Sequence, residues 1–257
     1  MKLFKKENYY LGFTGVAGFI IIWEIVSRLR LVSPILVSSP EAVLNSEIEL
    51  FATGAIFPHL FQSLSEVIVG LTLAIFLGVL FGFIIGRFSR LEKVVHPLVY
   101  ALYSTPAIAI FPLILIWLGF SLWTKVAIVF LASFFPIVIN TTAAVKNLDP
   151  NFIRLAKSFE AYDFDIFKSI TLPSSLPFII SGIRIAVPRS ITGMVVAEFF
   201  ASNAGLGHLI SYFGATFQTE KFLAVVFIII VLSVALTSII GFFEKRTQNW
   251  KPEKTTY

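Results

Sequence analysis

The sequence contains no cysteine, only three histidines and few charged residues. The absence of cysteine excludes disulfides, thiol catalysis and metal sites with cysteine ligands. The histidines, His59, His96 and His208, lie far apart in the chain, so we expect no metal site. No G-x-x-x-x-G-K-[ST] motif is present, so we do not expect the chain to bind ATP by itself.

Charged residues make up 14% of the 257 residues and hydrophobic residues 57%. Soluble domains are usually about a quarter charged, so this composition predicts an integral membrane protein. The net charge of +5 is also compatible with a nucleic-acid partner, but no basic patch stands apart from the membrane flanks. We therefore interpret the positive charge as loop charge at a bilayer surface and expect no nucleic-acid partner.

The apolar residues fall in blocks of about 20, the length that an α-helix needs to cross the hydrocarbon core. They predict an all-α protein with one transmembrane domain, 1–257, and six spans. The spans run roughly over 11–29, 63–86, 97–119, 123–145, 175–200 and 222–243. The basic start also resembles a signal peptide, but its apolar run is long and no A-x-A-like site follows. We interpret it as an uncleaved first span, with cleavage as the alternative.

The distribution of lysine and arginine predicts the orientation in the membrane. Of the 20 such residues, 14 lie in the N-terminus, the 87–95 loop, the 146–173 segment and the C-terminal tail. Four lie on the opposite side, and Arg184 and Arg189 fall within a span. Because cytoplasmic loops carry the excess of positive charge, both termini and the 146–173 segment should be cytoplasmic.

Two stretches predict irregular or interfacial helices. Ser38–Glu41 is a helix-start signal, and we expect a short helix on the outer face after it. Residues 103–120 contain Pro106 and Pro112 and predict a broken or kinked helix. The hydroxyls of Ser104 and Thr105 are available to satisfy backbone groups that the break leaves free.

Five charged residues fall in or near predicted spans: Glu24, Glu66, Arg184, Arg189 and Glu198. Such residues usually face protein or water, because a charge in the bilayer centre is costly. One reading is a translocation path or gate, with candidates Ser104, Thr105, Arg184, Arg189 and Glu198. The other is pairing between helices or reaching from a span end to the interface, which suits Glu24 and Glu66.

Arg184 and Glu198 are expected not to pair with each other. They lie about 21 Å apart along a straight helix at 1.5 Å per residue. Pro188 and Gly193 lie between them and make a straight helix doubtful.

A charged segment, about 147–173, lies between two spans. Its apolar residues recur at helical spacing and predict an amphipathic helix, with a stop at Leu172-Pro173. The residues of this stripe are Leu155, Phe159, Tyr162, Ile166 and Ile170. The pattern alone fits either a solvated interfacial helix or a helix that docks a cytoplasmic protein.

The same segment fits a family motif. It reads Arg154-Leu155-Ala156, three residues, Glu160, nine residues, Ile170, one residue, Leu172-Pro173. This frame resembles the E-A-A, G, I, L-P motif of bacterial ABC importer permeases of the type I, MetI-like fold. The sequence departs from it at Arg154-Leu155 and at Glu160, where the family has glycine at a turn between two short helices.

Further stretches, in order along the chain, resemble the sulfonate/taurine/nitrate subgroup of these permeases. They are the Ser-Pro pair at Pro40, H-x-x-x-SL at 59–64, PLILIWLGF at 112–120, FFPIVIN at 134–140, SGIRIA at 181–186, VVAEFF at 195–200 and GLGHLI at 205–210. The resemblance covers nearly the whole chain from about residue 34.

The resemblance implies a transport subunit of a bacterial inner-membrane importer, not an enzyme. Its partners would be a cytoplasmic ATPase dimer that binds ATP and Mg, a second identical or different permease copy and an extracytoplasmic solute-binding protein. The implied ATPase-coupling residues are Arg154, Ala156, Phe159, Glu160, Ala161, Tyr162, Asp163, Phe164, Ile170, Leu172 and Pro173. Residues 161–164 would form the tip, and the solute would be a small sulfonate-, nitrate- or vitamin-precursor-like compound.

Two other classes remain open. A secondary transporter driven by an ion gradient would use Glu66, Arg184 and Glu198 within the membrane. A membrane enzyme would need clustered His, Asp or Ser near one face, and the histidines are too scattered to supply such a cluster.

Overall fold

The computed structural model describes the backbone of residues 2–29, 31–33 and 36–248, and their side chains from Thr14 to Thr247. These residues form helices joined by turns and contain no strand, which confirms the predicted all-α fold. The helices are α1 (Lys2–Arg28), α2 (Pro40–Ala52), α3 (Ile56–Arg87), α4 (Ser89–Ser104), α5 (Ala107–Leu118), α6 (Leu122–Lys146), α7 (Pro150–Ser158), α8 (Asp163–Ile166), α9 (Leu172–Ala201), α10 (Leu206–Ala215) and α11 (Thr219–Gln248), with a π-helical turn at Phe167–Thr171.

Among the described residues, four helical stretches are long and apolar enough to cross a membrane: α3, α6, α8 continued into α9, and α11. A fifth span is formed if α4 and α5, which meet at an angle of 96°, count as one bent span. These five agree with five of the six predicted spans. The predicted first span falls on α1, whose first twelve side chains lie outside the described residues, and it stays a prediction.

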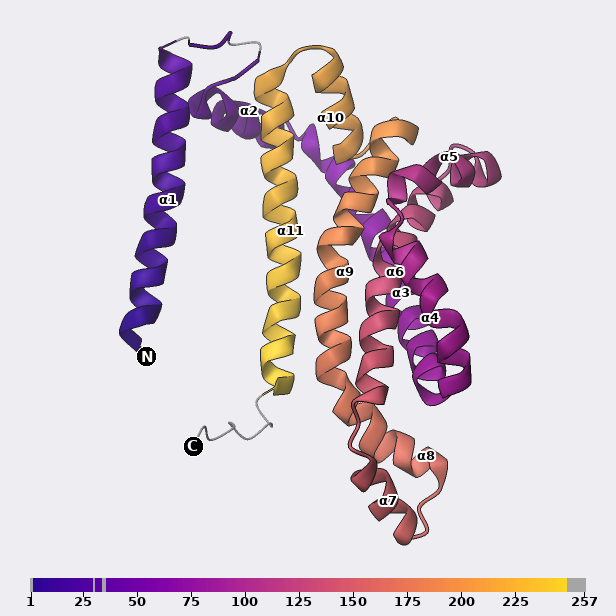
Figure 1. Ribbon diagram of the computed structural model, residues 1–257. Helices are drawn as coiled ribbons and strands as arrows, with labels where there is room; N and C mark the ends of the chain where they lie inside the picture. Colours follow the sequence, from indigo (N-terminus) through magenta and orange to yellow (C-terminus); the bar gives the residue numbers. More distant parts are fainter. Residues whose placement is uncertain (1, 30, 34–35, 249–257) are drawn as a thin grey trace.

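Helices α3, α6 and α9 form the centre of the molecule, and α6 packs most extensively against both others. Helix α11 covers α9, and α1 lies beyond α11 (Figure 1). Trp23 of α1 stacks on Phe227 of α11 with ring centroids 6.0 Å apart. The start of α1, the end of α11 and α7 with α8 lie at one end, whereas α2, α5 and α10 lie towards the other.

A stripe of small residues lets α3 approach α6 closely. Gly70, Ala74, Gly78, Gly82 and Gly86 recur every four residues and so share one face of α3. A Cβ atom at Gly70 would lie 2.6 Å from Val129 Cγ1, and one at Gly82 would lie 2.5 Å from Thr141 Cβ. Small residues of this kind bring helix backbones together where lipid supplies no hydrophobic drive for association.

The predicted short outer helix is α2. Its N-cap is Ser39, whose hydroxyl accepts a hydrogen bond from the Ala42 amide at 3.1 Å, and Pro40 opens the first turn. The side-chain acceptor satisfies one of the amides that a helix start leaves unpaired. The local signal at Ser38–Glu41 therefore predicted this element correctly.

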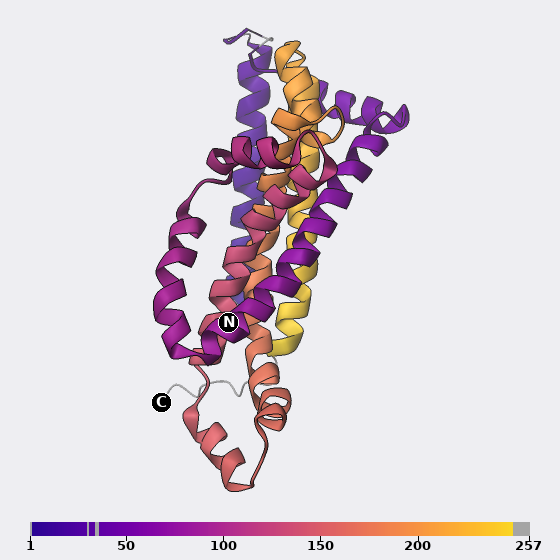
Figure 2. The ribbon, with the colours of Figure 1, turned by 90° about the vertical axis from the view of Figure 1, so that its right-hand side faces the viewer.

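The chain breaks between α4 and α5, as residues 103–120 predicted. Thr105 is extended, Pro106 follows it, and the Thr105 hydroxyl donates to the Ala101 carbonyl at 2.9 Å. Figure 2 shows α4 set apart from the central helices and α5 lying across them. By contrast, α9 is continuous through Pro188. The expectation that Pro188 would interrupt this helix is therefore wrong.

Candidate functional site

The charged segment between α6 and α9 projects from one end of the molecule as two short helices, α7 and α8 (Figure 1). The prediction of one continuous amphipathic helix is wrong, because α7 ends at Ser158 and α8 begins at Asp163. The residues between them form a turn. The apolar residues keep helical spacing across this turn, so their spacing alone does not reveal the break between α7 and α8.

The turn is a Schellman motif with Glu160 at its left-handed position. Glu160 has φ of 59°, its amide donates to the Lys157 carbonyl at 3.0 Å, and the Ala161 amide donates to the Ala156 carbonyl at 3.1 Å. Glycine is the usual residue here because a Cβ atom disfavours this conformation. The backbone thus keeps the turn that the motif implies, although Glu160 replaces the glycine.

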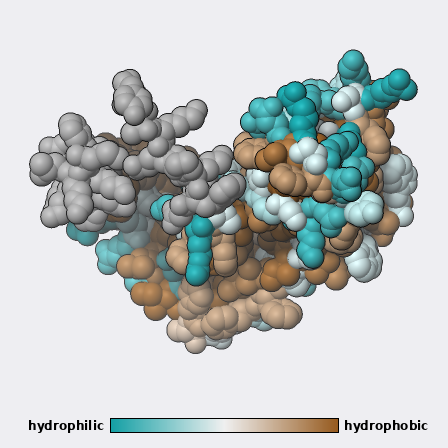
Figure 3. Space-filling model, turned by 90° about the horizontal axis from the view of Figure 1, so that it is seen from below, coloured by the Kyte–Doolittle hydropathy of each residue, from teal (hydrophilic) through white to brown (hydrophobic). Residues whose placement is uncertain are grey.

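Three aromatic side chains on and beside this turn are exposed. The exposed fraction is 77% for Phe159, 80% for Tyr162 and 71% for Phe164. Seen from this end, hydrophilic and hydrophobic residues lie side by side over the surface drawn in colour (Figure 3). Apolar area grouped with polar residues outside the spanning helices is typical of a protein interaction site.

The segment joins α9 without a stop, which corrects the expectation for Leu172-Pro173. Helix α8, the π-helical turn and α9 follow one another directly, and Pro173 lies in the first turn of α9. Two contacts hold the junction against the end of α3. Phe167 packs edge-on to Phe83 at 5.1 Å, and Arg87 lies 3.4 Å from Asp163. Helices α8 and α9 are therefore joined by continuous helical backbone, with no loop between them.

Three of the five candidates for a translocation path line one cavity of about 660 Å³ at the α4–α5 break. These are Ser104, Thr105 and Arg189. The other two lie elsewhere. Arg184 forms an ion pair with Glu244 of α11 at 2.6 Å, and Glu198 is fully buried near the opposite end of α9. Arg184 and Glu198 do not pair with each other, as their spacing predicted.

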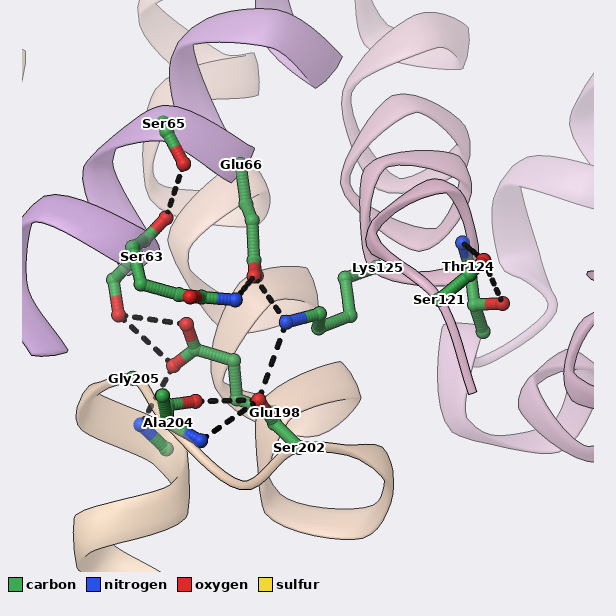
Figure 4. A network of polar contacts seen from close by, with 12 residues as sticks. Ser63, Ser65, Glu66, Ser121, Thr124, Lys125, Glu198, Ser202, Ala204 and Gly205 are labelled. Carbon is green, nitrogen blue, oxygen red and sulfur yellow. Dashed lines mark hydrogen bonds and ion pairs between the residues drawn. The ribbon is translucent and has the colours of Figure 1, made fainter. Parts of the chain in front are cut away.

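Glu198 belongs to a buried polar network that joins α3, α6, α9 and α10 (Figure 4). Its carboxylate accepts hydrogen bonds from the Ser63 hydroxyl at 2.7 Å and from the Gly207 amide at 2.8 Å. The Leu206 amide in turn donates to the Ser63 hydroxyl at 2.9 Å. Glu198 and Ser63 thus cap the N-terminus of α10, where the helix dipole favours a negative charge.

The second half of the network is an ion pair between Glu66 and Lys125, with a separation of 2.5 Å. Both side chains are buried, and Lys125 also donates to the Ser202 hydroxyl at 3.2 Å. Of the two structural readings for Glu66, pairing between helices is therefore confirmed, and reaching to the interface from the span end is not. Glu24, the other carboxylate expected near a span end, forms an ion pair with Arg28 at 2.5 Å.

Sequence reasoning missed Lys125, Glu244 and the small-residue face of α3. Lys125 lies near a span end, where its charge resembles ordinary loop charge. Glu244 directly precedes Lys245 and Arg246, so the sequence gives no sign that it pairs inside the molecule. The face of α3 has a readable signal in the four-residue recurrence from Gly70 to Gly86. Among the described residues, no group of three or more His, Asp or Glu is placed to hold a metal ion.

These features define a polytopic helical membrane protein with a helical projection that continues into one span. Comparison with known proteins gives the family. Residues 74–249 match the family described as the binding-protein-dependent transport system inner membrane component, and the chain belongs to this family. It is the permease type of ABC importer subunit, a transport subunit that works with a separate ATPase.

The names of three relatives specify different solutes. The formylaminopyrimidine transport permease protein ThiX of Halalkalibacterium halodurans is 32% identical, over 91% of this chain and 93% of its own length. The putative aliphatic sulfonates transport permease protein SsuC of Bacillus subtilis is 29% identical, over 96% and 90%. The taurine transport system permease protein TauC of Escherichia coli is 27% identical, over 95% and 90%.

Solved structures share the fold. A chain of the MetNI methionine ABC transporter in an inward-facing conformation matches with a TM-score of 0.61 and 17% identity, over 77% of this chain and 96% of that chain. A chain of an amino acid ABC transporter solved with histidines matches with a TM-score of 0.60 and 16% identity, over the same shares. These likenesses confirm the predicted MetI-like fold.

Proposed function

We propose that this chain forms half of the solute path in a bacterial inner-membrane importer and transmits ATPase closure through α7 and α8. The path would be completed by a second permease copy, and an extracytoplasmic binding protein would deliver the solute. The solute is a small compound of the sulfonate-, nitrate- or vitamin-precursor-like kinds, in line with the names of the relatives. Both termini and the α7–α8 projection face the cytoplasm.

The observation that carries the coupling role is the exposed aromatic tip on a projection continuous with α9. Tyr162 and Phe164 expose apolar surface on α8 and the turn before it, outside the proposed spans. An ATPase cleft that buries these rings would gain the free energy of apolar burial. Closure of the ATPase dimer would then move α8, and α9 would tilt with it as a rigid element.

The ATPase supplies the chemistry, since ATP and Mg bind to it and not to this chain. In this chain, Arg87 and Phe83 support the base of the projection, and the turn at Glu160 sets the angle between α7 and α8. The role of these residues is positional. They would transmit a movement at the tip to the helices that line the path, and the tilt of these helices would change the side of the membrane to which the path is open.

Co-purification tests the coupling role. The double substitution Tyr162→Asp plus Phe164→Asp should abolish capture of the ATPase by tagged permease, because two carboxylates in an apolar cleft are costly to desolvate. Phe217→Asp is the matched control, since Phe217 is also exposed but follows α10 at the opposite end. Unchanged capture by the double variant would show that the tip does not dock the ATPase.

A further inference from the structure

The cavity at the α4–α5 break lies between helices that a solute path would use. Its walls come from the break itself, from α6 and from α9, and its volume is about 660 Å³. Non-helical backbone at membrane depth is tolerated where it lines a cavity or is buried in protein. The break between Ser104 and Ala107 therefore borders a space large enough for a small organic solute.

Among the residues that the structure describes, Arg189 is the one charged residue that lines this cavity. It lies about 25 Å from Leu172 and about 18 Å from Ala201 along α9, at 1.5 Å per residue. Among the described residues, no carboxylate lies within ion-pair distance of its guanidinium, in contrast to Arg184, which pairs with Glu244. A cation at such depth without a carboxylate partner is costly, and this arrangement is typical of a binding site or pathway.

The guanidinium instead lies over the ring of Tyr103, with its central carbon 4.5 Å from the ring centroid. This cation–π contact is weaker than an ion pair and leaves the edge of the guanidinium free to donate hydrogen bonds. The side chain is thus held in place but not neutralised. An oxyanion that enters the cavity would find a positioned donor that needs no rearrangement to bind it.

Two threonines in the lining further restrict the chemistry of a ligand that fits the cavity. The Thr192 hydroxyl donates to the Pro188 carbonyl at 3.1 Å, and the Thr105 hydroxyl donates to the Ala101 carbonyl. Because both protons are used, these hydroxyl oxygens present acceptor lone pairs to a ligand. The rest of the lining is mainly apolar. The best fit is a small organic solute with an oxyanionic head and an N–H or O–H donor elsewhere.

We propose that this cavity is a solute-binding site inside the membrane, and that Arg189 binds the oxyanionic head of the transported compound. The proposal rests on the transport role proposed above and specifies the chemical class of the solute. Tyr103 is a positioning residue, because it orients Arg189 without forming the charged contact itself. The start of α5 borders the same cavity and adds partial positive charge, but the site depends on Arg189.

Direct binding to the full-length chain in zwitterionic-lipid nanodiscs tests the proposal. The probe is trifluoromethanesulfonate, observed by the broadening of its ¹⁹F NMR line, and the neutral control is methyl trifluoromethyl sulfone. We expect saturable broadening for the anion that methanesulfonate competes away. Arg189→Gln should weaken binding at least five-fold, and Arg189→Lys should retain part of it because the charge remains.

Arg184→Gln is the matched control, since it removes the same charge from the same helix but lies outside the cavity, and it should bind as the parent chain does. Equal binding by the parent and Arg189→Gln would overturn the proposal, as would equal weakening by Arg184→Gln or equal broadening of the neutral sulfone.

If Arg189→Gln does not fold, Arg189→Lys and Tyr103→Leu must still weaken binding. The Tyr162→Asp plus Phe164→Asp variant should keep full binding, so a failed ATPase interaction and a failed solute site give different results.

Discussion

Glu160 adopts a backbone conformation that its own side chain disfavours. It adopts φ of 59° in a Schellman turn where glycine is the preferred residue. For a non-glycine residue the left-handed conformation costs about 1–2 kcal/mol. The turn forms nevertheless, so the hydrogen bonds and packing around it outweigh this cost.

Replacement of Glu160 by glycine should therefore relax the turn. We expect Glu160→Gly to bind the ATPase as tightly as the parent chain and to raise the free energy of unfolding by up to about 1 kcal/mol, because the turn is already formed in the free chain. Titration of the ATPase against permease in nanodiscs measures this affinity. Glu160→Ala is the control, because it removes the carboxylate but keeps the Cβ atom; weaker binding in both variants would instead reveal an ionic partner for Glu160.

The buried ion pair between Glu66 and Lys125 is the second residue-scale determinant. Removal of one charge leaves the other buried without a partner, which typically costs about 3–5 kcal/mol. We expect Lys125→Met to lower the free energy of unfolding by this amount, as measured by denaturant titration in mixed micelles. The double variant Lys125→Met plus Glu66→Leu should recover most of the loss; no recovery would show that the pair is not the source of the effect.

At the scale of elements, the sequence predicted five of the six proposed spans, the short helix α2 and the α4–α5 break. Each of these depends on local signals, such as apolar blocks, Ser39 before Pro40, or Pro106 after Thr105. For the α7–α8 projection, periodicity alone predicted one helix, whereas the family motif implied two short helices with a turn at Glu160, which is the arrangement found. Periodicity cannot detect a single left-handed residue that separates two helices. The turn needs hydrogen bonds at Lys157 and Ala156, which spacing does not encode.

The contact between α3 and α6 gives the prediction at this scale. Gly82→Ala should lower the unfolding free energy by about 1–3 kcal/mol, because the new Cβ overlaps Thr141 between tightly packed backbones. Gly18→Ala in α1 is the matched control, since no atom lies within 4 Å of a Cβ built there. Its stability should be unchanged or raised by up to about 1 kcal/mol. Thermal unfolding followed by tryptophan fluorescence compares them, and equal stabilities would contradict the close approach.

For the whole molecule, composition predicted a membrane protein correctly, and the charge distribution gives an orientation that stays a prediction. Neither could predict which intramembrane charges meet. Ser63 and Glu198 are 135 residues apart, and Arg184 and Glu244 are 60 apart. Such pairings depend on how the spans pack, which no local pattern specifies. Three of the five path candidates still share one cavity, because the backbone break after α4 and Arg189 of α9 border the same space.

Orientation can be tested with the cysteine-free chain itself. In spheroplasts, a membrane-impermeant maleimide should label Asn203→Cys directly but label Lys157→Cys only after permeabilisation, because α10 and the α7–α8 projection lie at opposite ends. Both positions are exposed, so differences in labelling report the side of the membrane. The parent chain serves as the unlabelled control. The reverse pattern would invert the proposed orientation.

The central claim is that this chain couples ATP hydrolysis in a partner to solute entry. The most direct measurement is uptake into proteoliposomes that contain the purified complex, with the binding protein and the labelled ligand that co-purifies with it outside. We predict uptake only when ATP and Mg are enclosed in the lumen, and loss of that uptake with Tyr162→Asp plus Phe164→Asp. Uptake driven by an imposed proton or sodium gradient without ATP would contradict the account and identify a secondary transporter.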